Sequence, residues 1–99
     1  MSYSPQSDTE ILHKVEVPKK YKVILLNDDF TPMDFVLFVL ESFFQKSPEE
    51  AQHIMMNVHT QGSGVAGVYT FEIAEMKVHQ VNQLSQKNQY PLKTIMEAE

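Results

Sequence analysis

Two short segments that combine a hydroxyl residue, a proline and an acid restrict the fold of this chain more than any other feature. In Thr31-Pro32-Met33-Asp34, the threonine suits the N-cap of a helix, the proline suits its first position, and the acid can reach back to the cap. Ser47-Pro48-Glu49-Glu50 repeats this start signal. We therefore expect two helices joined by a few residues, which is a helical hairpin.

The residues after each start signal recur at helical spacing. The first run is apolar on almost every side, which predicts a largely buried helix, and it contains Phe35, Val36, Val39, Leu40 and Phe43. The second run has one apolar stripe, formed by Ala51, Ile54, Met55 and Val58. Gly62 is a natural C-terminal stop for the second helix.

Strand patterns lie on both sides of this hairpin. Residues 21–27 are apolar and β-branched almost without interruption, which predicts a strand covered on both faces. A glycine loop at 62–67 leads into a short strand at about 65–69, and Thr70 then caps a third helix. Its buried stripe is expected to be Ala74, Val78, Val81 and Leu84. Residues 92–96 read as a last strand. The order β-α-α-β-α-β predicts an α+β fold, a two-layer sandwich of three helices on a three-stranded antiparallel sheet.

Composition excludes several classes of protein. The chain has 99 residues, which suits one domain, and it contains neither cysteine nor arginine. A disulfide scaffold, a thiolate zinc site and a cysteine nucleophile are therefore excluded. A formal charge of −5 without arginine argues against nucleic-acid binding. The sequence shows neither an apolar run of the roughly 20 residues that a membrane helix needs nor a signal-peptide pattern, so we expect a soluble, cytoplasmic protein without a membrane partner.

The polar residues 1–18 predict a flexible N-terminal extension before a core domain at 19–99. Within the core, acidic residues concentrate between residues 28 and 50. This segment contains six acidic residues and one basic residue, Lys46. Such a concentration favours a cationic ligand group, although a solvated acidic surface explains it equally well. Asn27-Asp28-Asp29 likewise suits an ordinary turn between a strand and a helix.

The histidines and the glycine loop give no pattern typical of a metal or catalytic site. His53 and His59 are six residues apart on one predicted helix and so face different directions. Gly62-Ser63-Gly64 matches neither a nucleophile elbow nor a phosphate-binding loop, and its glycines suit a helix stop and a turn. One catalytic alternative stays open, a small hydrolase or metal-dependent enzyme that uses Asp28, Asp29 and His59. We expect no enzyme, metal or cofactor, because no nucleophile, base and orienting group can be assembled.

From Tyr21 to about Met96 the chain resembles ClpS, the bacterial N-end-rule adaptor family of the Clp protease. The resemblance is carried by three blocks, YKVILLNDDFTPMDFV at 21–36, AQHIMMNVH at 51–59 followed by Gly62, and GVYTFEIAEMKV at 67–78 with Tyr90-Pro91-Leu92 beyond it. The family fold is a sandwich of three helices on a three-stranded antiparallel sheet with a flexible N-terminal extension. It agrees with the fold that the residue pattern predicts.

The resemblance implies a function without catalysis. ClpS proteins bind proteins whose first residue is Leu, Phe, Tyr or Trp and deliver them to the ClpA unfoldase of the ClpAP protease. The family positions that hold the free α-amino group, directly or through water, correspond to Asn27, Asp29 and His59, with Asp28 beside them. The hydrophobic pocket corresponds to Leu25, Thr31, Met33, Val36, Met55, Val58 and Leu92. The position of Met33 also excludes β-branched Val and Ile in the family.

Other family positions concern delivery. Glu72 and Lys77 match positions that contact the unfoldase, and residues 1–18 match the extension that family members need for delivery. The chain departs from the family at two positions: Asp34 stands where many members have Glu, and Phe30 where many have Tyr. Phe30 lacks the tyrosine hydroxyl, so this chain cannot use that hydroxyl to dock a partner. A third alternative keeps the fold but not the function, as an interaction module with a decayed pocket.

Overall fold

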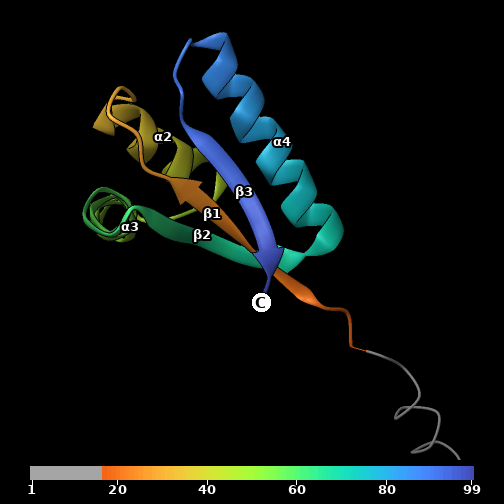
Figure 1. Ribbon diagram of the computed structural model, residues 1–99. Helices are drawn as coiled ribbons and strands as arrows, with labels where there is room; N and C mark the ends of the chain where they lie inside the picture. Colours follow the sequence, from red (N-terminus) through yellow and green to blue (C-terminus); the bar gives the residue numbers. More distant parts are fainter. Residues whose placement is uncertain (1–16) are drawn as a thin grey trace, which may run out of the picture.

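The computed structural model describes residues 17–99 and has the predicted order of elements. These are β1 (Lys20–Leu26), α2 (Met33–Phe43), α3 (Pro48–Gln61), β2 (Ser63–Thr70), α4 (Phe71–Lys87) and β3 (Lys93–Ala98). The α+β fold with three helices and a three-stranded antiparallel sheet is confirmed for this part of the chain (Figure 1). The predicted extension at 1–18 lies almost entirely outside the described residues.

The sheet places β1 at its centre, in the order β2-β1-β3, and both pairings are antiparallel. Leu25 lies opposite Gly64 on one side and Thr94 on the other. At the start of β1, the Glu99 backbone N–H donates to the Lys20 carbonyl at 2.9 Å, so the C-terminus lies beside this end of the strand. The other end of β1 leads to α2 and α3, which gather there (Figure 1).

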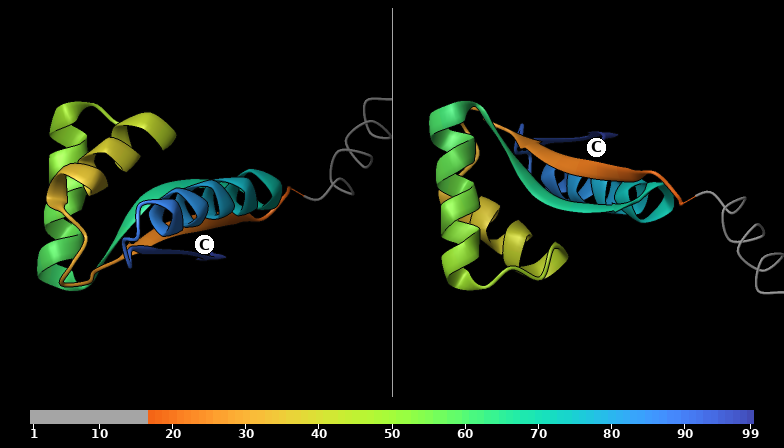
Figure 2. Two further views of the ribbon diagram at one scale, coloured as in Figure 1. Left: turned by 90° about the horizontal axis from the view of Figure 1, so that it is seen from above. Right: turned by 90° about the horizontal axis from the view of Figure 1, so that it is seen from below.

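The helices occupy different parts of the sheet. Helix α4 runs along the sheet, whereas α3 lies crosswise at the end where β1 finishes, as both views in Figure 2 show. The core between these layers includes Val23 and Leu25 of β1, Val39 of α2 and Val81 of α4, all of them fully buried. Ile24, between the two strand residues, faces the other side of the sheet and is also buried, but Lys22 and Leu26 on that side are only half-buried, so cover of both faces of β1 holds at Ile24 alone.

The two start signals behave differently. Ser47 caps α3 with a complete capping box, in which its hydroxyl accepts from Glu50 N and the Glu50 carboxylate accepts from Ser47 N. The prediction of Thr31 as the N-cap of α2 is wrong, since Pro32 occupies that position without a side-chain cap. The Thr31 hydroxyl donates instead to the Asp28 carboxylate at 2.8 Å.

The glycines after α3 have two different roles. Gly62 ends the helix as predicted, with a φ of 90° that only glycine adopts without strain. Gly64 and Gly67 do not form a loop, because β2 begins already at Ser63. A Cβ atom on Gly64 would come within 2.8 Å of Val58 Cγ2 and 3.2 Å of the Ile54 carbonyl oxygen. The glycines predicted a loop, but the structure has a strand there. Gly64 is needed because its missing side chain lets α3 approach β2 closely.

Helix α4 begins after Thr70 as predicted, although the threonine side chain makes no capping bond. Of its predicted stripe, Ala74 and Val81 are buried, whereas Val78 and Leu84 are only half-buried. Ser85 is buried instead, and its hydroxyl donates to the Val81 carbonyl one turn earlier. Polar side chains thus complete the buried face of this helix.

Candidate functional site

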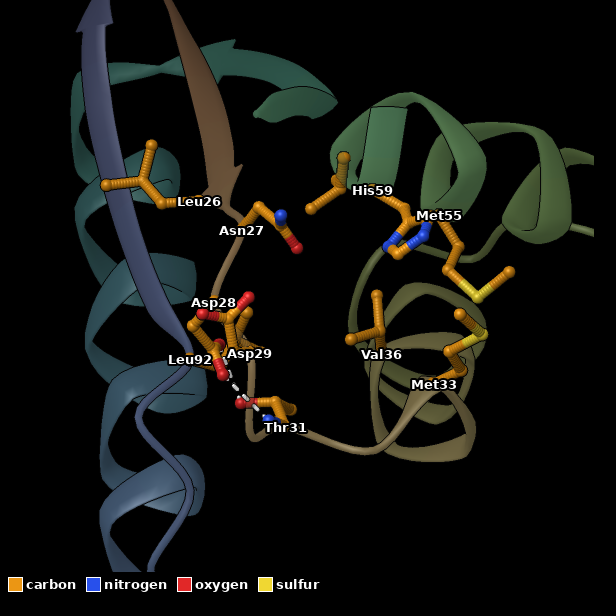
Figure 3. A pocket seen from close by; sticks show the side chains of 11 residues that line it. Leu26, Asn27, Asp28, Asp29, Thr31, Met33, Val36, Met55, His59 and Leu92 are labelled. Carbon is orange, nitrogen blue, oxygen red and sulfur yellow. Dashed lines mark hydrogen bonds between the residues drawn. The ribbon is translucent and has the colours of Figure 1, made fainter. Parts of the chain in front are cut away.

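The site is a cavity of about 190 Å³ at the end of β1, between that strand and the two hairpin helices (Figure 3). Four segments supply its walls: the end of β1 with the turn after it, the start of α2, one side of α3, and the residue just before β3. The lining residues are Leu26, Asn27, Asp28, Asp29, Thr31, Met33, Val36, Met55, Val58, His59 and Leu92. The cavity is smaller than the 300–1,000 Å³ typical of drug-sized ligands, which suits a single amino-acid side chain.

Helix α3 brings polar and apolar groups to the cavity together. Met55, Val58 and His59 follow the i, i+3, i+4 spacing and therefore share one side of the helix. The Ser47 capping box and the Gly62 stop define the two ends of this helix. Its side chains therefore keep fixed relative positions, as a binding site requires.

The apolar residues of the cavity wall are buried, except at the opening of the cavity. Val36, Met55, Val58 and Leu92 are each less than a tenth exposed. Met33, in contrast, is 49% exposed at the first position of α2. Its thioether and that of Met55 lie on the same side of the cavity in Figure 3. Unbranched, polarizable methionine side chains adapt to different apolar partners.

The polar rim has three side chains with unused hydrogen-bonding capacity. Within residues 17–99, the side chains of Asn27, Asp29 and His59 make no hydrogen bond, and all three are exposed. Figure 3 shows Asn27 and His59 extending from opposite sides toward the same gap. An amide oxygen, a carboxylate and a neutral imidazole nitrogen can all accept hydrogen bonds from one cationic donor. The rim is therefore suited to an ammonium group.

Asp28 is already committed to the turn. Its Oδ1 accepts from Thr31 N at 2.7 Å and from Phe30 N at 2.8 Å, and its Oδ2 accepts from the Thr31 hydroxyl. Partial burial raises the pKa of Asp28, but these bonds from Thr31 and Phe30 outweigh that effect and hold the pKa below its ordinary value. The carboxylate stays ionised and fixes the loop that carries Asp29 beside the cavity.

One predicted pocket residue belongs to the core rather than to the cavity lining. Leu25 is fully buried in the core cluster that also contains the lining residues Val36, Met55, Val58 and Leu92. Its neighbour Leu26 is among the lining residues, but successive side chains of a strand point to opposite faces, and the Leu26 side chain points away from the gap between Asn27 and His59 in Figure 3. The remaining predicted pocket and rim residues all line this cavity.

The two positions matched to the unfoldase contact lie on α4, outside the lining of the cavity. Glu72 is exposed in the first turn of the helix. Lys77 is half-buried, and its ammonium group donates to the Phe43 carbonyl of α2 at 2.6 Å. The same group lies 5.6 Å from the ring centre of Phe44 and 5.1 Å from that of Tyr69. Lys77 thus has a structural partner within the chain.

Two kinds of feature are absent from the described part of the chain. Across residues 17–99, no group of three or more histidine, aspartate or glutamate side chains is placed to hold a metal ion. Among the helices of that same part, none has the length and apolar character needed to cross a membrane.

Three comparisons relate this chain to proteins of one family. The family model described as ATP-dependent Clp protease adaptor protein ClpS matches residues 16–95. The Clp protease adapter protein ClpS of Bdellovibrio bacteriovorus is 58% identical over 97% of this chain and 86% of the relative. The ClpS of Bartonella quintana is 57% identical over 85% of this chain and 76% of the relative.

A solved structure extends this similarity to three dimensions. It is Agrobacterium tumefaciens ClpS2 bound to L-phenylalaninamide, with a TM-score of 0.81 and 41% sequence identity. The similarity covers 84% of this chain and all of that one. Together with the matched sequence, the fold and the cavity at the end of β1, these findings show that the chain belongs to the ClpS family of ATP-dependent Clp protease adaptor proteins.

Proposed function

We propose that this chain binds the free α-amino group and the large hydrophobic first side chain of proteins that begin with Leu, Phe, Tyr or Trp. The observation that carries the proposal is the junction of an ammonium-compatible rim with an apolar cavity sized for one side chain. The similar ClpS2 protein was solved with L-phenylalaninamide, which has a free α-amine, a phenyl side chain and an amide in place of the next peptide bond. This ligand has both of the groups that the site would recognise.

Each part of the ligand has its own partners. An α-ammonium group brings three N–H donors and one positive charge, for which Asn27, Asp29 and His59 provide three acceptors. Hydrogen bonds to a charged group contribute roughly 1.5–3 kcal/mol each. The first side chain would lie against Val36, Met55, Val58 and Leu92, with Thr31 and Met33 around the opening. Burial of a Leu or Phe side chain adds roughly 1.5–3 kcal/mol, so we expect micromolar or tighter affinity.

Asp28 and Met33 have particular roles in this proposal. Asp28 orders the turn through Thr31 and adds negative potential beside the amine. Met33, at the mouth, would exclude first residues that branch at Cβ, such as Val and Ile. The site would work without metal, cofactor or chemical reaction.

Fluorescence anisotropy with labelled peptides tests the binding step. We expect binding of peptides that begin with Leu or Phe and little binding of peptides that begin with Val or acetyl-Leu. His59→Ala should weaken Leu binding at least about tenfold, since one charge-assisted contact is lost. His53→Ala is the matched control, because His53 is on the same helix but does not line the cavity. Equal binding of all four peptides would refute the proposal.

Delivery is the second step of the proposed function. The bound protein would pass to the ClpA unfoldase of the ClpAP protease in the cytoplasm, through a contact that includes Glu72 and Lys77 on α4, with residues 1–18 required for the transfer. The exposed position of Glu72, away from the cavity, supports this assignment because substrate and unfoldase could then be held together.

A pull-down with the N-terminal domain of ClpA tests the contact. Glu72→Lys should weaken capture of the unfoldase while peptide affinity stays unchanged. Glu75→Lys, which makes the same charge change at another exposed position of α4, is the control. Equal capture by wild type and Glu72→Lys would remove Glu72 from the contact.

A further inference from the structure

Two thioether groups line one small cavity in this protein, and they differ strongly in exposure. Met33 is 49% exposed, whereas Met55 is only 8% exposed. Two other methionines, Met56 and Met76, are exposed to a similar extent, at 46% and 49%, but neither lines the cavity. Among the methionines of residues 17–99, an oxidant in solution would therefore reach Met33 most readily in the binding site, and Met56 and Met76 elsewhere.

We propose that Met33 is a modification site at which peroxide-class oxidants switch off binding of hydrophobic first residues. The proposal rests on the function proposed above. In the reaction, a lone pair on Met33 Sδ attacks one oxygen of hydrogen peroxide and the O–O bond breaks. An S–O bond forms, and the other oxygen leaves as water after a proton transfer. Sulfur is oxidised by two electrons to the sulfoxide, and the peroxide is reduced to water.

The sulfoxide changes the mouth of the cavity from apolar to polar. The cavity residues beyond the mouth are apolar, namely Val36, Met55, Val58 and Leu92. The nearby Thr31 hydroxyl and backbone N–H both donate to Asp28 and are therefore unavailable to the new oxygen. A first side chain that entered the cavity would remove water from the sulfoxide without offering a donor in exchange. We expect the affinity for a Phe-led peptide to fall at least about tenfold, because burial of an unpaired polar group is unfavourable.

Exposure also determines the order of reaction. Met55 is buried behind the mouth, so its thioether should react more slowly than that of Met33. A bound peptide would cover Met33 and leave Met56 and Met76 in solvent. Occupancy of the site should therefore protect one methionine selectively. Methionine sulfoxide reductases reverse this oxidation, so the loss of binding should also be reversible.

The test compares full-length wild type with Met33→Leu, Met56→Leu and Met76→Leu, each before and after graded treatment with hydrogen peroxide. Peptide mass spectrometry measures sulfoxide at each methionine, and anisotropy with a labelled Phe-led peptide measures affinity relative to the same variant untreated. We expect wild type, Met56→Leu and Met76→Leu to lose affinity in proportion to sulfoxide at position 33. Met33→Leu should keep its own untreated affinity at the same dose, and the reductases should restore binding to the wild type.

Two results would overturn the proposal. One is wild-type protein that has complete sulfoxide at Met33 and unchanged affinity. The other is Met33→Leu protein that loses affinity at the same dose as wild type, which would place the sensitive group elsewhere. Excess Phe-led peptide present during oxidation should slow sulfoxide formation at Met33 but not at Met56 or Met76. Absence of binding by untreated wild type would instead refute the function proposed above, so the two failures are distinguishable.

Discussion

The amide of Asn82 pairs with both backbone groups of Thr94. Asn82 Oδ1 accepts from Thr94 N at 2.9 Å, and its Nδ2 donates to the Thr94 carbonyl at 3.0 Å. Because β3 is an edge strand, this one side chain replaces a missing neighbour strand at that residue. The contact also fixes the start of β3, two residues after Leu92 of the cavity wall.

Replacement of Asn82 should therefore destabilise the fold. Asn82→Ala would leave two backbone groups of the buried Thr94 without their partner, and we expect the free energy of unfolding to fall by about 1–3 kcal/mol. Urea denaturation followed by circular dichroism measures this change. Asn88→Ala is the control, since Asn88 is exposed and its side chain donates only to the Leu84 carbonyl of its own helix. Equal effects of the two variants would contradict this role of Asn82.

Lys77 should stabilise the end of α2. The last turn of α2 contains no basic residue, and Lys77 of α4 supplies a cation to its Phe43 carbonyl from outside the helix. Lys77→Met keeps much of the apolar length but removes the charge, and it should lower the free energy of unfolding by about 1.5–3 kcal/mol. Lys19→Met, at an exposed site outside the helices and strands, should change the free energy of unfolding by less than about 0.5 kcal/mol. A thermal or urea unfolding series compares the two.

Lys77→Met also separates stability from peptide binding. A variant that is less stable but still folded at the assay temperature should bind peptides normally, because Lys77 does not line the cavity. A variant with wild-type stability would show that the bond to Phe43 contributes nothing measurable.

Gly64→Ala should disturb the binding site through the packing of α3 on β2. The new methyl group would meet Val58 Cγ2 at 2.8 Å and the Ile54 backbone oxygen at 3.2 Å, and the second of these cannot move without the helix. We expect a destabilisation of about 1–3 kcal/mol and weaker peptide binding, since Val58 lines the cavity. Urea unfolding and anisotropy on the same sample measure both. An unchanged free energy of unfolding together with an unchanged peptide affinity would show that α3 can shift away from the new methyl group without cost.

Asp28 should make stability depend on pH. Its pKa is lower in the folded chain than in the unfolded chain, so its contribution is complete above about pH 4 and disappears as the pH falls through the folded value. Asp28→Asn should therefore be less stable than wild type at pH 7, and the difference should shrink at pH 3. Urea midpoints at both pH values measure it. The control Asp29→Asn changes a neighbouring exposed carboxylate that makes no hydrogen bond within residues 17–99.

Periodicity and cap signals predicted much of the fold. The order of elements and the start and stop of α3 are confirmed, because Ser47, Glu50 and Gly62 act through local geometry. The role of Thr31 was wrong, because Asp28 competes for its hydroxyl. The purpose of Gly64 was missed as well, because its reason is a contact with α3 that no local pattern reveals.

The candidate site was only partly accessible from the residue pattern. Asn27-Asp28-Asp29 suited an ordinary turn, and Asp28 does form one with Thr31 and Phe30. The assignment of the rim came from the resemblance, and its chemical roles stay predictions. Leu25 was predicted in the pocket; it does not line the cavity but lies in the core cluster that also contains four of the lining residues. The long-range partners of Asn82 and Lys77 leave no signature in the sequence.

The position of the cavity at one end of the central strand has a mechanical consequence. A pull applied between a ligand in the cavity and Lys20 would run along β1, parallel to the strand rather than across it. The part of the load that enters through α3 or Leu92 would reach β1 through its pairings with β2 and β3, which would carry it in shear, together and not one bond at a time. The same domain pulled outward by the edge strand β3 would open sequentially from one end of the pairing. Its resistance to force should therefore depend strongly on the direction of the pull.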